Sequence, residues 1–305
     1  MKKKYVSLCL IGAIVAGLCL NLGIRMYPAA KIGVEAEKII NDLQWVVPLT
    51  DENRYQKKNL GEKYERIRID EQIRPRELKA EPYKIVKDGW IRYIVNGKGE
   101  RTIDIHDIYD QIDDYRHVAM LPIDENQEDW DRIVVLGRDY QPIFGGAVFR
   151  EVRPYSEGLS YCIKYRYGDY EHLSICSKPE KGFMDEDGKL VIKTPGCIDT
   201  SDFSQGRAIV YTHDKVYIIG RDGNEIFSMK ARAVIRHDLL MQCMEGFNEH
   251  GTAPIYDGKN WGLIDRNGNW IIKPVFGGIW WIGTEFIEIS YLYKRGIARF
   301  PGGEK

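Results

Sequence analysis

The sequence lacks the short motifs that identify most enzymes and cofactor-binding proteins. Its six cysteines show no C-x-x-C spacing. A glycine-rich phosphate loop is missing, and the serines near histidines have no catalytic-triad context. The acidic turns lack the alternating acids and the final glutamate of a calcium-binding loop. The sequence therefore predicts no cofactor and no established catalytic motif.

An excess of positive charge is also missing. The 305 residues carry 44 Lys and Arg against 45 Asp and Glu, for a net charge of −1. Residues 1–30 hold four basic side chains and no acid, so the remainder has 40 basic against 45 acidic side chains. This balance gives no electrostatic footprint for nucleic acid, and we predict that the protein does not bind it.

Long uncharged runs are rare, and the one at the N-terminus is informative. Residues 5–24 contain no charged side chain and follow three lysines. Twenty helical residues span a hydrocarbon core of about 30 Å, and lysines on the near side keep the N-terminus in the cytoplasm. Residues 1–30 therefore predict a signal anchor in the cell membrane, single-pass, with the C-terminal domain outside the cytoplasm. The alternative is a cleaved signal peptide and a secreted protein.

Residues 31–85 read as a stalk or linker. A short helix is favoured within VEAEKIINDLQW, and residues 53–79 hold nine basic and five acidic side chains. Such charge density is typical of a solvated linker. Contact with anionic lipid or a wall polymer is the alternative.

Residues 86–305 repeat a hairpin pattern of an apolar run, a turn and a second apolar run. FMDEDGKLVI, YIIGRDGNEIF and GLIDRNGNWII align without gaps, whereas VVLGRDYQPIF and YIVNGKGERTI fit less closely. The aligned turn positions are Gly99, Tyr140, Gly188, Gly223 and Gly268. Asp-Gly and Asn-Gly supply the two positive φ angles that a tight two-residue turn needs.

These turns also predict which residues face each other across each hairpin. The predicted outer pairs are Phe183 with Ile192, Ile218 with Phe227, and Leu263 with Ile272. The predicted inner pairs are Met184 with Val191, Ile219 with Ile226, and Ile264 with Ile271. Adjacent strand residues point to opposite sides, so both faces of every hairpin should be apolar and should need a neighbouring sheet.

A second element precedes the later hairpins and reads aromatic, polar pair, Gly, any residue, small residue. Its copies start at Tyr155, Phe203, Phe247 and Tyr293. Four short strands in about 45 residues match the period of a propeller blade. The sequence therefore predicts an all-β fold of tandem hairpins in about five propeller-like blades. A β-solenoid is the alternative packing.

The best of these units resembles the WG-repeat family of bacterial proteins. Matching positions are Phe247, Glu249, Gly251, Ala253, Trp261, Gly262, Ile264, Asp265, Gly268, Ile272 and Pro274. Two earlier units depart from the pattern, with Lys181-Gly182 and Val216-Tyr217 in place of Trp-Gly. The resemblance covers residues 155–300. It implies a β-repeat architecture and no catalytic residues.

One segment, IDIHDIYDQIDDYRHVAM, has candidate metal ligands. Its apolar residues recur at helical spacing: Ile105, Ile108, Ile112, Tyr115 and Ala119. On the opposite face of such a helix lie His106, Asp110, Asp113 and His117. Two imidazoles and two carboxylates placed in this way could hold Zn²⁺. A polar face opposite an apolar one is also typical of any surface helix.

Trp280 and Trp281 are the candidate ligand-binding residues. They follow the last hairpin, where we expect a loop. Adjacent aromatic side chains there could stack on a sugar or clamp a peptide. Because neighbours in a strand face opposite ways, we expect at least one of the two rings to be buried.

Cys162 and Cys176 form the candidate disulfide. If residues 160–178 form an additional hairpin that turns about Asp169, Ile163 faces Ile175 and the two cysteines face each other. An exported domain permits oxidation. Two unpaired buried thiols are the alternative.

The last repeat is incomplete, because residues 293–300 begin a unit that no hairpin follows. The first hairpin has the opposite defect, since no aromatic-Gly strand precedes it. We therefore predict that residues 293–300 pair into the blade built around residues 90–105 and close a ring, which would leave no open sheet edge.

The sequence favours a non-enzymatic, membrane-anchored β-repeat protein. It would act outside the cytoplasm as a binding or scaffold module for an envelope protein or a glycan. The alternative is an exported metal-dependent hydrolase that uses the His and Asp cluster within residues 106–117.

Overall fold

The computed structural model describes residues 33–51, 83–89, 91–113, 116–121, 132–169, 179–233, 235, 246–282 and 285–301. Strands dominate these ranges, and residues 33–42 form a helix. The all-β prediction is therefore confirmed. Within the same ranges no helix has the length and apolar character needed to span a membrane. Residues 5–24 lie outside them.

The described strands form five antiparallel sheets. The first sheet contains β2 (Lys84–Asp88), β3 (Ile91–Val95) and β4 (Arg101–Ile105). The long sheet contains β5 (Asp107–Gln111), β6 (His117–Met120), β7 (Ile133–Leu136), β8 (Ala147–Val152), β9 (Ser160–Asp169), β10 (Glu180–Met184) and β11 (Leu190–Lys193). A short 3-10 helix, η2 (Phe144–Gly146), precedes β8.

Three further sheets follow. The third sheet contains β12 (Asp199–Thr200), β13 (Arg207–Tyr211), β14 (Lys215–Gly220) and β15 (Glu225–Lys230). The fourth sheet contains β16 (Thr252–Tyr256), β17 (Trp261–Asp265) and β18 (Trp270–Phe276). The last sheet contains β19 (Gly278–Ile282), β20 (Phe286–Tyr291), β21 (Lys294–Arg299) and the N-terminal strand β1 (Trp45–Asp51).

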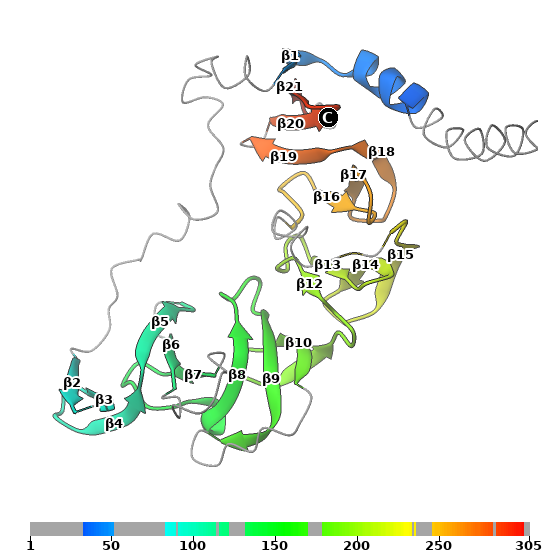
Figure 1. The fold of residues 1–305 in the computed structure, drawn as a ribbon. Coiled ribbons are helices and arrows are strands. Elements are labelled where there is room, and N and C mark those ends of the chain that lie inside the picture. The colour runs from blue at the N-terminus through cyan, green and yellow to red at the C-terminus, as the bar shows by residue number, and fades with distance from the viewer. Residues whose placement is uncertain are drawn as a thin grey trace, which may run out of the picture.

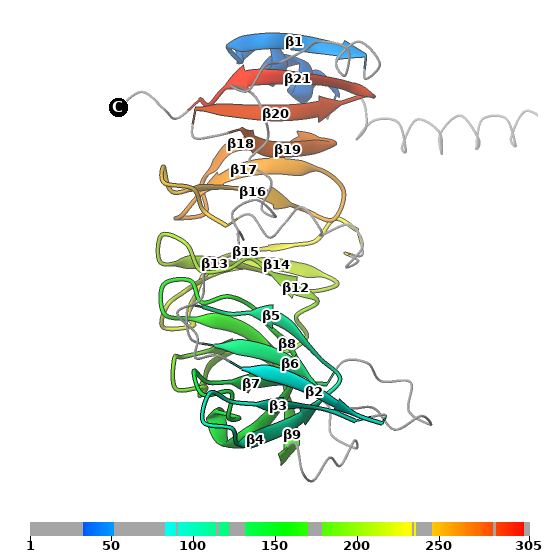
Figure 2. The same ribbon diagram turned by 90° about the vertical axis from the view of Figure 1, so that its left-hand side faces the viewer.

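The sheets follow one another along an open arc (Figure 1). The first sheet lies at one end of the arc and the last sheet at the other (Figure 1). The view at right angles shows the last, fourth and third sheets in succession, with the first sheet overlapping the long sheet (Figure 2). The predicted ring closure is therefore wrong. β21 pairs with β1, where Ile297 faces Val47, and not with the sheet that contains Ile94.

All five aligned turns are present, and they share one hydrogen-bond pattern. In the third of them, Gly188 N–H donates to the carbonyl of Asp185 (3.0 Å), and Asp185 N–H donates to the carbonyl of Lys189 (3.0 Å). The equivalent turns start at Asn96, Gly137, Gly220 and Asp265. Positive φ occurs only at the fourth turn residue, as at Gly188 (75°) and Tyr140 (61°). This is a type I turn closed by a bulge, so the predicted two-residue turn is wrong.

The acidic and amide residues that open these turns hold them by side-chain hydrogen bonds. Asp185 Oδ1 accepts from the backbone N–H groups of Asp187 (3.1 Å) and Lys189 (2.9 Å). Asp265 Oδ1 accepts in the same way from Asn267 and Asn269, both at 2.8 Å. Such local bonding favours turns over continuous strands, and an Asp or Asn opens three of the five turns in this way, at Asn96, Asp185 and Asp265.

Each of the three best hairpins contains the same bulge. The predicted outer pairs are confirmed: Phe183 with Ile192, Ile218 with Phe227, and Leu263 with Ile272. The predicted inner pairs are wrong, because Met184 faces Leu190, Ile219 faces Glu225, and Ile264 faces Trp270. The displaced residues are Val191, Ile226 and Ile271, which are 45%, 39% and 36% exposed. An extra residue in one strand rotates this side chain away from the interior.

The turn glycines stack each hairpin on the one before it. A Cβ at Gly188 would lie 2.3 Å from the ring of Phe144, and a Cβ at Gly268 would lie 2.5 Å from Phe227. At Gly223 the nearest atom, 3.2 Å away, belongs to Ile192. These neighbours hold the same position in the preceding unit, four residues after its own turn position. The same contact therefore sets the stacking of successive units.

The aromatic-Gly elements form a second set of links between units. Ser156 Oγ donates to the carbonyl of Phe203 (2.5 Å), and Ser204 Oγ donates to the carbonyl of Phe247. Phe203 and Phe247 are buried, as core residues of the repeat should be. Tyr293 was predicted to be a fourth copy, but it is 94% exposed in the turn between β20 and β21. That part of the repeat assignment is wrong.

The N-terminal strand β1 takes the place of the second strand of a repeat hairpin. Ala298 faces Trp45 and Ile297 faces Val47, with a register shift at Val46, which is 39% exposed. The fourth sheet has the same arrangement around Ile271. A Cβ at Gly296 would lie 2.6 Å from the ring of Trp45, as one at Gly262 would lie 2.8 Å from Trp270. The last unit is thus completed by a strand from the other end of the sequence.

The stalk prediction is wrong for residues 33–51. The short helix predicted there is confirmed over residues 33–42. Its Ala36 is buried in a core that also contains Ile279 and Ile287 of the last sheet. Trp45 Nε1 donates to the carbonyl of Ile40 (2.8 Å), so helix and strand dock together. Residues 52–82 lie outside the described ranges.

Candidate functional site

The predicted metal-binding helix is absent, because its residues form β4, β5 and β6. In this hairpin Asp107 faces Met120, and Gln111 faces His117. His106 therefore lies beside the far end of β6, roughly 13 Å from His117 along the strand at about 3.3 Å per residue. Zinc ligands must converge to about 2 Å from one ion. The geometry on which the hydrolase alternative depended is lost.

Of the four candidates, Asp110 lies within β5 and Asp113 lies just beyond its end. Asp113 forms an ion pair with Arg116 (2.8 Å) and accepts its backbone N–H. Asp110 lies in β5, opposite Val118. Among the described residues no group of three or more His, Cys, Asp and Glu side chains could hold a metal ion. The apolar spacing predicted a helix, but the segment forms strands because isoleucine, which is β-branched, favours strands when a neighbouring sheet is available.

His117 is a core residue. It is 3% exposed and stacks on Tyr140 with ring centroids 4.8 Å apart. Tyr83 contacts the same tyrosine at 4.4 Å. Burial lowers the pKa of His117, although the charge of Asp113 acts in the opposite direction. Burial, and then Tyr83, raises the pKa of Tyr140 to about 12. Both rings are therefore neutral at physiological pH.

Trp280 and Trp281 lie in β19 and not in a loop. Trp280 is buried, which confirms that at least one ring would be, and the guanidinium of Arg295 lies 5.5 Å from its ring centroid. Arg295 also pairs with the buried Glu288 at 3.2 Å. Trp281 packs edge-on against Phe300, with centroids 5.3 Å apart. Both indoles thus contact neighbours within or beside the last sheet.

The register predicted for Cys162 is wrong. Gly182 of β10 lies opposite Cys162 on one side, and Val152 of β8 lies opposite it on the other. No further strand can pair with β9 at this point, so the predicted additional hairpin is instead the one formed by β9 and β10. The thiol of Cys162 is free and buried, and burial raises its pKa to about 12. Cys176 lies outside the described residues.

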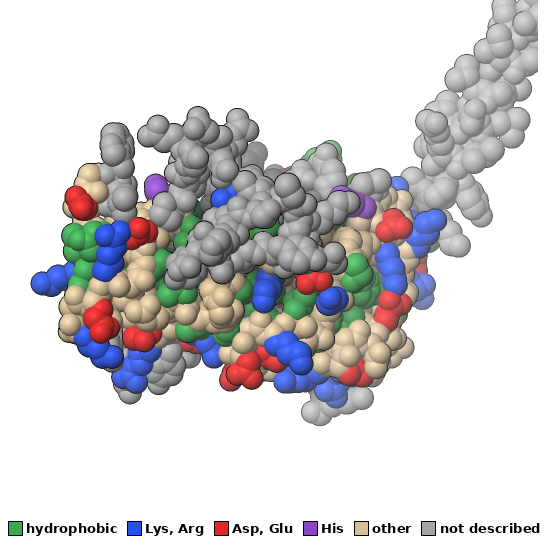
Figure 3. Space-filling view, turned by 90° about the horizontal axis from the view of Figure 1, so that it is seen from below, with side chains coloured by type: hydrophobic (Ala, Val, Ile, Leu, Met, Phe, Trp, Pro, Cys, Tyr) green, Lys and Arg blue, Asp and Glu red, His purple; other side chains and the backbone are tan. Residues whose placement is uncertain are grey.

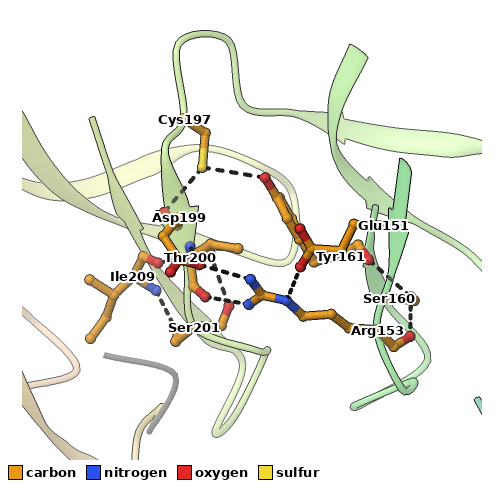
Figure 4. A network of polar contacts seen from close by, with 9 residues as sticks. All are labelled: Glu151, Arg153, Ser160, Tyr161, Cys197, Asp199, Thr200, Ser201 and Ile209. Carbon is orange, nitrogen blue, oxygen red and sulfur yellow. Dashed lines mark hydrogen bonds and ion pairs between the residues drawn. The ribbon is translucent and has the colours of Figure 1, made fainter. Parts of the chain in front are cut away.

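A buried ionic network joins the long sheet to the third sheet (Figure 4). Arg153, which follows β8, pairs with Glu151 through Nε (2.7 Å) and with Asp199 of β12 (2.8 Å). It also donates to the carbonyl of Thr200 (2.6 Å). The side chain of Arg153 is only 9% exposed, and that of Asp199 is 5% exposed. The ionised side chains therefore stabilise one another away from water.

Aromatic and thiol groups enclose this ion pair. The guanidinium of Arg153 lies 4.7 Å from the ring centroid of Tyr161. The Tyr161 hydroxyl donates to Cys197 Sγ (3.7 Å), and the Cys197 thiol donates to the carbonyl of Asp199 (3.1 Å). Ser160 Oγ donates to the carbonyl of Arg153 (2.5 Å). The network therefore connects residues on three strands and two sheets.

The protonation states of this network suit a structural joint between the two sheets. Burial lowers the pKa of Arg153, but Glu151 and Asp199 raise it by more. The net effect is a raised pKa, so the guanidinium stays charged. Burial raises the pKa of Tyr161 and of Cys197, so hydroxyl and thiol remain protonated. A protonated buried thiol is a poor nucleophile. Sequence reasoning missed this network because Asp199 is 46 positions from Arg153 and no motif marks either residue.

Charged side chains of both signs are mixed over the described part of the face in Figure 3. A field of one sign steers nucleic acid to many of its binding proteins, and this face has none over its described part. The expectation that nucleic acid is not a partner stays a prediction.

The repeat geometry agrees with a family comparison. Residues 261–280, which span β17, its turn, β18 and the start of β19, match the model of the WG containing repeat. The chain carries a WG repeat. The resemblance inferred from Trp261 and Gly262 is thereby confirmed, and the structure explains the Gly of the WG pair. A Cβ there would lie 2.7 Å from the carbonyl oxygen of Ile272.

Comparison with solved structures gives distant similarity. One chain of a crystal structure of BBS1N in complex with ARL6DN, soaked with mercury, has 13% identity and a TM-score of 0.35, covering 73% of this chain and 76% of that chain. The same complex soaked with lead has 14% identity and a TM-score of 0.32, covering 73% of this chain and 76% of that chain. A protein of unknown function from Bacteroides caccae has 10% identity and a TM-score of 0.30, covering 67% of this chain and 80% of that chain. Among curated proteins none matches significantly. TM-scores this low carry no argument about function.

Proposed function

We propose that this WG-repeat protein is a non-catalytic binding or scaffold module that presents its arc to an envelope protein or a glycan outside the cytoplasm. The observation that carries the proposal is a set of four exposed aliphatic side chains at equivalent repeat positions. These residues, the bulge row, are Val46, Val191, Ile226 and Ile271, between 36% and 45% exposed. Each lies in the outermost strand of its sheet, β1, β11, β15 or β18.

The bulge row is a property of the repeat. A polar side chain at a solvent-facing bulge would not weaken the core, and scattered exposed aliphatic residues are common. Here the same chemistry recurs in four units, and one copy comes from the distant strand β1. Turn glycines of three successive units pack on the preceding unit, so Val191, Ile226 and Ile271 lie at equivalent positions of similarly stacked hairpins. Apolar side chains repeated at equivalent positions suit an extended protein surface or polymer.

Substituting the row tests this function. The variant Val191→Thr, Ile226→Thr and Ile271→Thr keeps β-branched side chains, so we expect each change to alter stability by less than about 0.5 kcal/mol. Immobilised full-length protein should capture a defined set of envelope components, and this variant should lose them. The matched control is Ile85→Thr, which changes a residue of similar exposure (43%) outside the row. Equal capture by all three proteins would contradict the proposal.

Membrane attachment through residues 5–24 belongs to the same proposal. Its support is the uncharged run behind three lysines, together with the docking of residues 33–51 onto the last sheet. The intact mass of the protein extracted from membranes should include residues 1–30. A mature N-terminus near Lys31 would instead show a cleaved signal peptide and a secreted protein.

A further inference from the structure

The turn between β20 and β21 exposes two large apolar side chains. Leu292 is 69% exposed and Tyr293 is 94% exposed. Both residues have positive φ angles, 47° for Leu292 and 62° for Tyr293. Residues other than Gly, Asn and Asp rarely adopt this left-handed conformation. Asn-Gly fits such a hairpin turn without this strain. The turn therefore carries a strained apolar tip that contributes little to the packing of the sheet.

One exposed basic residue, Lys294, follows the tip on β21, opposite Asp51 of β1. The next residue, Arg295, pairs with Glu288 and lies over the ring of Trp280. Tyrosine rings and leucine side chains partition into the membrane interface, where the phenol hydroxyl remains at the level of the headgroups. Lysine beside them is attracted to anionic lipid phosphates. The tip thus has the side-chain chemistry of an interfacial membrane contact.

The architecture places this tip in the sheet that is joined to the proposed anchor. Lys294 faces Asp51 of β1, and β1 continues from the helix of residues 33–42. Nine residue steps separate residue 24 from residue 33, and an extended chain of that length reaches at most roughly 30 Å. Residue 33 must therefore lie within that distance of the membrane. The first sheet lies at the opposite end of the arc (Figure 1).

We propose that Leu292 and Tyr293 insert into the headgroup region of the membrane that holds the anchor, with Lys294 beside anionic phosphates. This inference rests on the proposed anchor at residues 5–24. The contact fixes the last sheet against the bilayer.

Photolabelling from the lipid side tests the contact. Full-length protein is reconstituted into vesicles of phosphatidylethanolamine and phosphatidylglycerol that contain a phospholipid with a diazirine near the top of its acyl chain. After illumination, lipid adducts are mapped by mass spectrometry. We expect adducts within residues 5–24 and on Leu292 or Tyr293, and none on the internal control Val191, which is 45% exposed on β11.

A matched variant separates membrane contact from folding. Leu292→Asn with Tyr293→Gly gives the turn its preferred residues, so the melting temperature should stay the same or rise. The adducts on the turn should be lost, whereas those within residues 5–24 should remain. Turn adducts of unchanged yield in this variant would overturn the inference.

The outcomes distinguish this inference from the anchor itself. Adducts within residues 5–24 without adducts on the turn would overturn the turn contact alone. Adducts on the turn without adducts within residues 5–24 would reject the anchor and support the contact. The absence of both would overturn both.

Discussion

At the scale of single residues, the turn glycines have two separate tasks. Gly268 has φ of 90°, and a Cβ there would lie 2.5 Å from Phe227 in the preceding unit. Gly99 has φ of 81°, but a Cβ there would meet no atom within 4 Å. One position therefore needs glycine for conformation and for contact, and the other needs it for conformation alone.

This difference predicts unequal effects of alanine. Gly99→Ala should lower the free energy of unfolding by about 1–2 kcal/mol, the cost of a left-handed conformation. Gly268→Ala should add overpacking of about 1–3 kcal/mol. Urea titrations of the two variants measure both values. Equal losses would show that successive hairpins do not stack through the turn.

The buried network around Arg153 predicts a large mutational effect. Arg153→Met removes the guanidinium that neutralises the buried carboxylate of Asp199, which should destabilise the fold by about 3–5 kcal/mol. Arg101→Met is the control, because its ion pair with Asp104 is 51% and 42% exposed and should contribute about 1 kcal/mol or less. Comparable losses in chemical unfolding would argue against a buried joint.

His117 predicts a pH dependence. Its pKa is lowered by burial below the ordinary value of 6.5, so the unfolded chain binds the proton first as pH falls. The neutral ring therefore stabilises the fold fully above pH 6.5. This contribution is lost as the pH falls below 6.5 toward the lower pKa that His117 has in the folded protein. His117→Phe keeps an aromatic ring against Tyr140 and cannot titrate. Its melting temperature should fall less than that of the wild type between about pH 7.5 and pH 5.5. Parallel pH curves for the two proteins would rule out this role.

Residue roles were predictable only where the chain is locally constrained. Gly188, Gly223 and Gly268 follow Asp or Asn in a short turn, and their positions identify three of the repeat hairpins. Arg153 offers no such signal, since its partner Asp199 lies on another sheet. Buried charge depends on tertiary neighbours, which local sequence does not specify.

At the scale of elements, turn signals predicted the hairpins but not their details. The outer pairs such as Leu263 with Ile272 follow from counting outward from the turn. The inner pairs failed because a bulge adds one residue to the second strand, and that depends on the fourth turn residue having positive φ. The helix predicted over the His and Asp cluster failed for another reason. Its apolar spacing fits a helix, but β6 pairs with β7 on one side and β5 on the other.

The strand β1 predicts a sharp contrast between neighbouring residues. Trp45 packs against Gly296 and donates a hydrogen bond to Ile40, so Trp45→Ala should lower the free energy of unfolding by roughly 3 kcal/mol. Val46 occupies the exposed bulge, so Val46→Ala should cost less than about 0.5 kcal/mol. Similar effects from both substitutions would mean that Trp45 is not seated against β21.

At the scale of the whole molecule, the sequence indicated that residues 293–300 need a strand from elsewhere, but it predicted the wrong partner. Residues 293–300 do need a strand from elsewhere, but that strand is β1 and not the sheet around residues 90–105. The segment that contains β1 has no turn signal and precedes a charge-dense region, so it reads as a linker. Its match to a hairpin strand becomes visible only when Trp45 is placed opposite Ala298.

The pairing of the two distant strands is the central claim, and a cysteine cross-link tests it most directly. Asp51 and Lys294 face each other in the register of β1 and β21. Facing residues of antiparallel strands have Cα atoms about 4.5–5.5 Å apart, which a disulfide can span. Asp51→Cys with Lys294→Cys should form this disulfide on mild oxidation, as detected by peptide mapping without reduction. In Lys84→Cys with Lys294→Cys, which probes ring closure through the first sheet, the introduced thiols should stay unlinked. A 84–294 disulfide, with free thiols at 51 and 294 in the first variant, would contradict the account.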